Sequence, residues 1–188
     1  KSAFSLALEE ARQTGGDLII ATDPDGDRLG VMVKKDGKYL LLTGNQTGAL
    51  LADYIIRSRK ENGTLPANGC VIKSVVTSDL GRKICEDYGV KMMDVLTGFK
   101  FIGEKMEEFE ETGEYTFLFG YEESYGSLAG TYARDKDAVV AALLVCEAAA
   151  YYRSRGMSLS DALAALFEKY GYHYETVVNF SVRGAGAL

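Results

Sequence analysis

The chain reads Leu18-Ile19-Ile20-Ala21-Thr22-Asp23-Pro24-Asp25-Gly26-Asp27-Arg28 near its start, an apolar run followed by three carboxylates at alternate positions. The apolar run predicts a strand over residues 17–22. The aspartates then share one tight loop, where each pair at about 4 Å repels by roughly 4 kcal/mol at an effective dielectric of about 20. A divalent cation offsets this repulsion, and carboxylate oxygens favour a hard ion, Mg²⁺ before Ca²⁺ or Mn²⁺. Asp23, Asp25 and Asp27 are therefore the candidate metal ligands.

Other interpretations of this loop remain open or are excluded by its sequence. A solvated acidic turn needs no metal, since Asp, Pro and Gly are ordinary turn residues. A calcium-binding EF-hand loop is excluded, because it requires Gly and Glu where this chain has Arg28 and Lys34. A phosphatase of the haloacid-dehalogenase type also places D-x-D-G after an apolar strand, although Asp27 departs from its usual continuation. Arg28 favours a nearby phosphate, or forms an ion pair with its own aspartates, and both can hold together.

Composition narrows the class of protein. The 188 residues carry a net charge of −6, so no basic face predicts a nucleic-acid partner or an anionic membrane surface. No apolar run approaches the length of a membrane span. Cys70, Cys85 and Cys146 lack metal or redox spacing, and we expect them to be reduced core residues of a cytoplasmic protein.

Hydrophobic periodicity predicts an α/β protein. The expected helices cover residues 2–13, 46–59, 78–88, 99–111, 135–155 and 158–170, and the expected strands cover 17–22, 29–34, 39–42, 70–76, 90–95, 115–120 and 176–182. Asp135 is the expected cap of the long helix, and Ser158 with Asp161 is spaced like a capping box. This alternation predicts a mixed, mainly parallel sheet sandwiched by helices, preceded by a partial α/β domain. The expected division is 1–43, 44–170 and a linker over 171–188.

Loops at the carboxyl ends of the strands carry the remaining candidate residues, because ligands gather there in such sheets. In the segment Thr97-Gly98-Phe99-Lys100, the glycine permits close backbone approach and the helix N-terminus favours an anion. In the loop Gly120–Gly126, Glu122 and Ser124 are spaced to grip vicinal hydroxyls of a sugar, or else form a solvated surface turn. Lys136 faces the same cleft or pairs with its neighbouring aspartates on the surface.

Together and in this order, these motifs resemble the α-D-phosphohexomutases, the family of phosphoglucomutase and phosphomannomutase. The resemblance implies four domains, with the metal loop in the second and sugar recognition in the third. It identifies Asp23, Asp25 and Asp27 as metal ligands, Arg28 and Lys136 as catalytic residues, and Thr97, Gly98, Phe99, Lys100, Glu122, Ser124 and Arg134 as substrate-binding residues. Glu122 and Ser124 would hold the sugar's 3- and 4-hydroxyls. Tyr125 and the doubled glutamate look like the phosphoglucomutase branch.

Two family motifs have no counterpart in the sequence: the serine loop that is phosphorylated and the phosphate loop of the fourth domain. The resemblance therefore implies the end of domain two, all of domain three and the linker to domain four of a phosphoglucomutase-type enzyme. It implies Mg²⁺, glucose 1,6-bisphosphate as intermediate, a hexose phosphate substrate, and the remaining domains of the same polypeptide as partners. We expect the chain alone to be inactive. Phosphomannomutase, phosphopentomutase, a haloacid-dehalogenase-type phosphatase and a non-catalytic sugar-phosphate-binding module are the alternatives.

Overall fold

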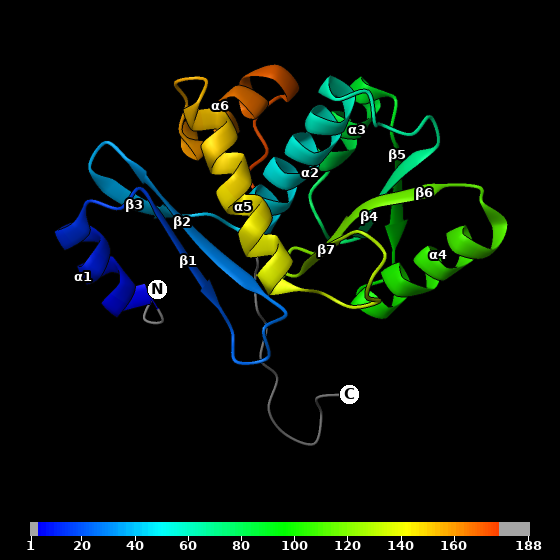
Figure 1. The fold of residues 1–188 in the computed structure, drawn as a ribbon, viewed down its shortest axis with the longest axis horizontal. Coiled ribbons are helices and arrows are strands. Elements are labelled where there is room, and N and C mark those ends of the chain that lie inside the picture. The colour runs from blue at the N-terminus through cyan, green and yellow to red at the C-terminus, as the bar shows by residue number, and fades with distance from the viewer. Residues whose placement is uncertain (1–3, 177–188) are drawn as a thin grey trace, which may run out of the picture.

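Two separate β-sheets organise the chain in the computed structural model, which describes residues 4–176 (Figure 1). The elements in chain order are α1 (Ser5–Thr14), β1 (Leu18–Thr22), β2 (Leu29–Lys35), β3 (Lys38–Leu41), α2 (Gly44–Glu61), β4 (Gly69–Ser74), α3 (Leu80–Tyr88), β5 (Lys91–Val95), α4 (Phe99–Thr112), β6 (Thr116–Tyr121), β7 (Ser127–Ala129), α5 (Ala138–Arg153) and α6 (Leu159–Tyr170).

The first sheet is antiparallel, in the order β1-β2-β3. Successive side chains of β2 point to opposite faces, so Met32 packs with the residues of α1 while Val31 and Val33 join the main core. Helices α5 and α6 contact this second face, and Figure 1 shows α5 lying beside β1 and β2. The acidic loop of Asp23, Asp25 and Asp27 is therefore carried by a sheet that is packed on both sides.

The second sheet has the order β5-β4-β6-β7, and its first three strands are parallel. Cys70 and Ile72 of β4 pack with α4, whereas Val71 between them packs with α2 and α3. Figure 1 shows α4 on one side of this sheet and α2 and α3 on the other. With helices on both faces, every residue of β4 is buried, including Lys73 and Ser74. The predicted mixed, mainly parallel sheet with helices on both faces is confirmed.

The long helix begins later than predicted. Asp137, not Asp135, is its N-cap, and its carboxylate accepts from the N–H groups of Val139 and Val140 at 2.8 and 3.0 Å. Asp137 itself has an extended backbone, and its N–H donates to Ser127 O on β7 at 2.9 Å, outside the helix. Strand β7 itself was not predicted, since three residues are too few for a periodic pattern. The capping box of Ser158 and Asp161 is present as predicted.

The prediction that all three cysteines lie in the core is wrong for Cys146. Cys70 and Cys85 are buried, whereas Cys146 lies on the exposed side of α5. That side also exposes Val139 and Leu143, because only the opposite face of this uniformly apolar helix meets the core. An apolar helix sequence therefore did not indicate which of its faces is buried.

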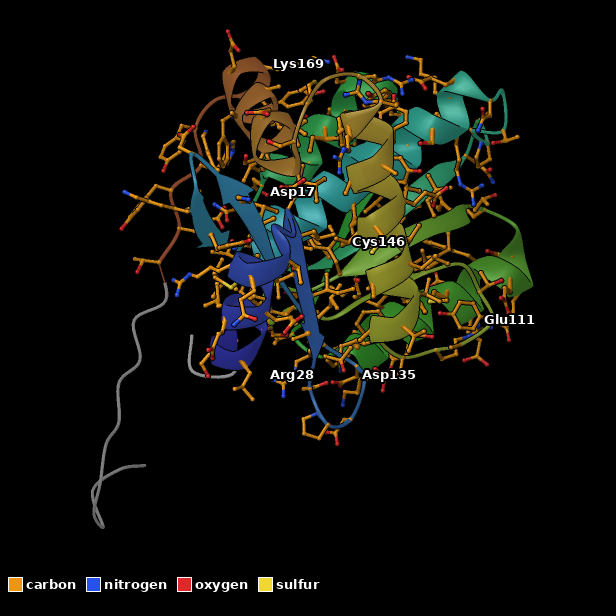
Figure 2. The ribbon with its side chains drawn as sticks, turned by 60° about the vertical axis from the view of Figure 1, so that its left-hand side comes forward. Asp17, Arg28, Glu111, Asp135, Cys146 and Lys169 are labelled. Atoms are coloured by element: carbon orange, nitrogen blue, oxygen red, sulfur yellow. The ribbon has the colours of Figure 1, made fainter. Side chains whose placement is uncertain are left out.

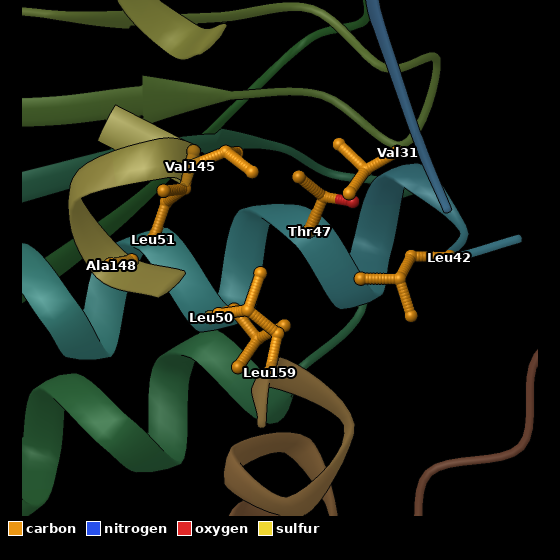
Figure 3. A pocket seen from close by; sticks show the side chains of 8 residues that line it. All are labelled: Val31, Leu42, Thr47, Leu50, Leu51, Val145, Ala148 and Leu159. Carbon is orange, nitrogen blue, oxygen red and sulfur yellow. The ribbon is translucent and has the colours of Figure 1, made fainter. Parts of the chain in front are cut away.

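A small cavity of about 10 Å³ lies inside the core between β2, α2, α5 and α6 (Figure 3). Its lining is apolar except for Thr47, whose buried hydroxyl has no hydrogen-bond partner within residues 4–176. A site for a polar ligand needs several converging polar groups, so this cavity is a packing gap. Over the described residues, no helix combines the length and apolar character needed to cross a membrane. The strand predicted over 176–182 lies outside the described residues except for its first position.

Candidate active site

The acidic loop follows β1, and its own carboxylate groups organise it. One carboxylate oxygen from each of Asp23, Asp25 and Asp27 lies within 4.8 Å of the others. Asp23 Oδ1 accepts from the backbone N–H groups of Asp27 and Arg28, each at 3.2 Å. Gly26 N–H donates to Asp23 O at 3.1 Å and closes the turn. Hydrogen bonds within the loop therefore help to gather the predicted three-carboxylate cluster.

Arg28 pairs with its own loop, one of the two roles expected for it. Its Nε lies 2.8 Å from Asp23 Oδ2, and its side chain remains half exposed. The hydrogen bond from the Arg28 side chain lowers the pKa of Asp23 to about 2. The Asp23 carboxylate consequently carries its negative charge throughout the neutral range, as a cation ligand requires.

The Asp27 carboxylate is placed to bind a cation. Asp27 Oδ1 is shielded from solvent and makes no hydrogen bond within the described part of the chain, and Arg28 Nε lies 3.7 Å away. A buried carboxylate oxygen without a partner is costly unless a positive charge meets it. Together with Asp23 and Asp25 it provides an all-oxygen donor set, which could hold a hard divalent cation.

The segment before α5 meets the acidic loop from the other side. Lys136 Nζ lies 3.2 Å from Asp27 Oδ2 and 3.4 Å from Asp135 Oδ1. Burial works against the charge of this ammonium group, but the bond to Asp27 and the charge of Asp135 outweigh it and raise the pKa of Lys136. The first N–H of α5, on Ala138, donates to Gly26 O at 2.9 Å. Figure 2 shows the labelled Arg28 and Asp135 at the same end of the molecule.

The loop after β6 is joined to the acidic loop by backbone pairing. Arg28 and Gly126 form an antiparallel β-bridge, and Leu29 N–H donates to Tyr125 O at 3.1 Å. Tyr125 has a φ of 74°, a conformation that side-chain-bearing residues rarely adopt. Such strain persists only where the surrounding structure imposes it. The two candidate loops thus form one connected unit.

Glu122 lies on the inner side of this unit and is 5% exposed. Its Oε1 accepts from Gly98 N–H at 3.0 Å, at the N-terminus of α4. The anion predicted for that helix terminus is therefore supplied by the protein itself. Ser124, two residues later, is exposed. The sequence placed Glu122 and Gly98 on separate loops, and the parallel sheet brings them into contact.

The other residues predicted to bind substrate differ in their burial and in what they contact. Phe99 is buried, with its ring centroid 5.7 Å from Lys136 Nζ. Lys100 is exposed, with Nζ 4.8 Å from the ring of its neighbour Phe101. Thr97 is exposed. The Arg134 guanidinium pairs with Glu110 of α4 and donates to Thr131 O at 3.0 Å, so it contacts α4 and its own loop.

Three residues at the site were missed by sequence reasoning. Gly126 is one, because a Cβ there would overlap Cδ of Lys136, whose side chain crosses this glycine on its way to Asp27. The other two are Ser74, the last residue of β4, and Thr77 in the turn that follows; their hydroxyls contact Glu123. Their signal was available, since β4 also ends at this edge of the sheet and polar residues follow it.

The chain is similar to proteins of one family along most of its length. The sequence profile for phosphoglucomutase/phosphomannomutase, alpha/beta/alpha domain III, matches residues 43–170, and that for domain II matches residues 1–37. A phosphoglucomutase of Staphylococcus haemolyticus (strain JCSC1435) is 37% identical over 175 residues, 92% of this chain and 31% of that protein. The chain spans about a third of the length of the curated relatives that it matches.

Solved structures show the same fold. A putative phosphomannomutase from Thermus thermophilus aligns with a TM-score of 0.69 at 24% identity, over 89% of this chain and 34% of that one. The N-acetylphosphoglucosamine mutase of Aspergillus fumigatus, in complex with GlcNAc-6P and magnesium, aligns with a TM-score of 0.58 at 14% identity, over 83% and 36% respectively. The two matched profiles together cover most of the chain, including the acidic loop and the loop after β6 that is joined to it, so this chain belongs to the phosphoglucomutase/phosphomannomutase family.

Proposed function

We propose that this chain forms the metal-binding and sugar-recognising part of a phosphoglucomutase-type enzyme that interconverts glucose 1-phosphate and glucose 6-phosphate. The observation that carries the proposal is the pairing of Arg28 with Gly126, which joins the acidic loop to the loop of Glu122 and Ser124. A site that moves a phosphoryl group on a sugar needs cation chemistry and hydroxyl recognition side by side. The relatives' names and the matched profiles support the same activity.

Asp23, Asp25 and Asp27 would hold Mg²⁺, which supplies charge compensation for the transferring phosphoryl group when bound. Asp27 Oδ1, which makes no hydrogen bond within residues 4–176, supports this choice, as does the magnesium present with GlcNAc-6P in the complex of the fungal relative. Arg28 would hold a phosphoryl oxygen with the guanidinium nitrogens that its bond to Asp23 leaves free. The phosphorylated serine, and the rest of the substrate phosphate site, would come from other domains of the same polypeptide.

The reaction would proceed in two transfers through glucose 1,6-bisphosphate. In the first, the bond between the serine oxygen and phosphorus would break as phosphorus bonds to the free hydroxyl oxygen of the hexose monophosphate. That hydroxyl would lose its proton, and the departing serine oxygen would take one up to become a hydroxyl again. The bisphosphate then turns around, and its other phosphoryl group returns to the serine. Turning exchanges the approximate positions of the 3- and 4-hydroxyls, so Glu122 and Ser124 would serve both orientations.

Lys136 is the better placed of two lysines to act at the reacting hydroxyl. Its ammonium group lies beside Asp27, whereas Lys100 is exposed beside Phe101. Because the pKa of Lys136 is raised, it would stabilise the attacking oxygen as a hydrogen-bond donor in the neutral range, more readily than remove its proton.

The test is Glu122→Gln in the full-length protein, with transfer to glucose 1-phosphate and to glucose 6-phosphate measured separately in single-turnover assays. We expect both transfers to slow by a similar factor, roughly tenfold or more, because one carboxylate serves both orientations. Glu107→Gln, on the exposed side of α4, is the matched control. Loss of only one transfer would contradict the dual role. Activity that is indifferent to chelators and to Asp25→Asn would contradict the mutase assignment itself.

The haloacid-dehalogenase alternative would use Asp23 as nucleophile. Both oxygens of that carboxylate are already engaged, Oδ1 by two backbone N–H groups and Oδ2 by Arg28, which disfavours attack on phosphorus. Trapping an aspartyl-phosphate mimic with BeF₃⁻ would overturn the mutase proposal. We also expect the 188-residue chain alone to give no turnover in a coupled assay with glucose 1-phosphate, because its nucleophile lies elsewhere.

A further inference from the structure

Glu122 and Glu123 are adjacent in the loop after β6 (residues 122–126, here called the recognition loop), and their side chains contact different partners. Glu122 reaches the N-terminus of α4 through Gly98. Glu123 instead reaches the turn after β4, where its Oε2 accepts from Ser74 Oγ at 2.8 Å and from Thr77 Oγ1 at 3.1 Å. Its backbone N–H also donates to Thr77 Oγ1, at 3.2 Å. Glu123 is therefore bound to the scaffold at both its main chain and its side chain.

The two hydroxyl groups that donate to Glu123, those of Ser74 and Thr77, are buried. Ser74 and Thr77 are 0% and 4% exposed, and their hydroxyl oxygens lie 2.6 Å apart. The two hydroxyls have one proton each, and the carboxylate, which only accepts, can receive both. Without it the hydroxyls could still bond to each other, but one buried hydroxyl proton would lack an acceptor, which is more costly than the loss of an exposed hydrogen bond.

The turn that holds Glu123 is itself anchored in the sheet. Lys73 Nζ, only 1% exposed, donates to Thr77 O at 2.8 Å and pairs with Asp94 Oδ1 at 3.0 Å. Lys73 and Asp94 face each other in the parallel register of β4 and β5. The buried ammonium group is thus satisfied by fixed partners, and it holds the Thr77 backbone in place.

The start of α2 supports the same residue through its backbone. A Cβ built on Gly44 would lie 2.7 Å from the carbonyl carbon of Glu123, so the two backbones are in direct contact. Strands β4 and β5 and helix α2 therefore all act on one position of the recognition loop. Because Glu123 is held at its main chain and side chain, it fixes the backbone from which the side chains of Glu122 and Ser124 project.

We propose that Glu123 is a positioning residue: through Ser74 and Thr77 it fixes the loop so that Glu122 and Ser124 are presented to the sugar. This inference rests on the proposed function and adds a residue that does not itself contact substrate. The alternatives are that Glu123 binds the sugar directly or only stabilises the fold.

A double-mutant cycle in the full-length protein separates these roles. The single variants are Glu123→Gln and Thr77→Val, and the second removes a hydroxyl on a different strand end with little change of shape. We expect each to reduce kcat/KM by roughly tenfold, and the double variant to lose little more, because both break one connection. Additive losses, or a Thr77→Val enzyme with unchanged kinetics, would overturn the proposal. Glu107→Gln is again the control.

Amide hydrogen exchange provides a readout that does not depend on activity. We expect Thr77→Val to accelerate exchange across residues 120–126 while the melting temperature stays within a few degrees of the parent. Unchanged exchange there would overturn the positioning role even if activity fell. Conversely, if exchange responds as expected but the parent protein converts no hexose phosphate, the proposed function fails and the connection between the loops stands.

Discussion

Lys136 Nζ lies 3.2 Å from Asp27 Oδ2, so a lysine from the segment before α5 forms a direct ion pair with a carboxylate of the acidic loop. The same lysine crosses Gly126 and approaches the ring of Phe99. Three segments that are distant in sequence therefore meet at one ammonium group. In the proposed function, this position would couple cation binding to phosphoryl transfer, because the lysine and the cation would share the carboxylate of Asp27.

Lys136→Met should separate these two properties. Removal of the ammonium group leaves Asp27 free of its competing cation, so we expect Mg²⁺ to bind more tightly by a few-fold. Turnover should nevertheless fall by roughly a hundredfold, since the donor near the reacting hydroxyl is lost. Isothermal titration calorimetry of the full-length protein measures its affinity for Mg²⁺, and steady-state assays measure its turnover. Weaker Mg²⁺ binding would contradict this account.

Gly126→Ala should damage the site through a steric effect. The added Cβ would overlap the Lys136 side chain, which must then leave its position beside Asp27. We expect kcat to fall at least about tenfold and stability to fall by about 1–3 kcal/mol, as is typical of overpacking. Gly16→Ala is the control, because a Cβ there makes only ordinary contacts. Equal kinetics for the two variants would show that the close approach has no role.

Asp53 should be one of the most destabilising positions to truncate. It is 0% exposed and accepts from Arg57, Tyr88 and Tyr152, which ties α2, α3 and α5 together. Asp53→Ala leaves these donors unpaired, and we expect a loss of about 3 kcal/mol in the free energy of unfolding. Urea denaturation measures it, with Glu107→Ala expected to change stability by less than about 0.5 kcal/mol. A loss of that small size at Asp53 would be inconsistent with its contacts.

The three cysteines should differ sharply in reactivity. Burial raises the pKa of both the Cys70 and the Cys85 thiols to about 12, whereas Cys146 is exposed on α5. The native 188-residue chain should therefore consume one equivalent of a thiol reagent, and all three cysteines should react after denaturation. Cys146→Ser should abolish the native reaction. Reaction of a second thiol without unfolding would show that the core opens locally.

The cap of α5 should give a pH-dependent contribution to stability. Burial alone would raise the pKa of Asp137, but hydrogen bonds from Val140, Tyr132 and Val139 outweigh it and hold the pKa below its ordinary 3.8. A lowered folded pKa means that the charged carboxylate stabilises the fold above pH 3.8, and that this contribution is lost as the pH falls through the folded pKa. Asp137→Ala should cost about 1 kcal/mol at pH 7.

Denaturant titrations of the parent and of Asp137→Ala, from about pH 7 to about pH 3, measure how their difference in stability changes with pH. The gap between parent and Asp137→Ala should stay constant down to about pH 4.5 and narrow below it. Asp137→Asn keeps an acceptor without a charge, so its advantage over the alanine variant should not change with pH. A gap that widens in acid would contradict the direction assigned here.

Local patterns in the chain determined the elements and the chemistry of the candidate site. The D-P-D-G-D-R loop after an apolar strand, the Ser158–Asp161 capping box and the alternation of strands and helices were all predicted and found. These features depend on residues within a few positions of one another, and their periods follow from backbone geometry. The resemblance of ordered motifs supplied the family.

Only the tertiary structure decided which partners these residues have. It paired Lys136 with Asp27, directed Glu123 to Ser74 and Thr77, moved the start of α5 to Ala138 and left Cys146 exposed. Each outcome depends on how strands register and helices pack between distant segments, and local periodicity contains no information about either. An apolar helix or an acidic side chain has several partners of similar energy, and the packing of the whole chain selects among them.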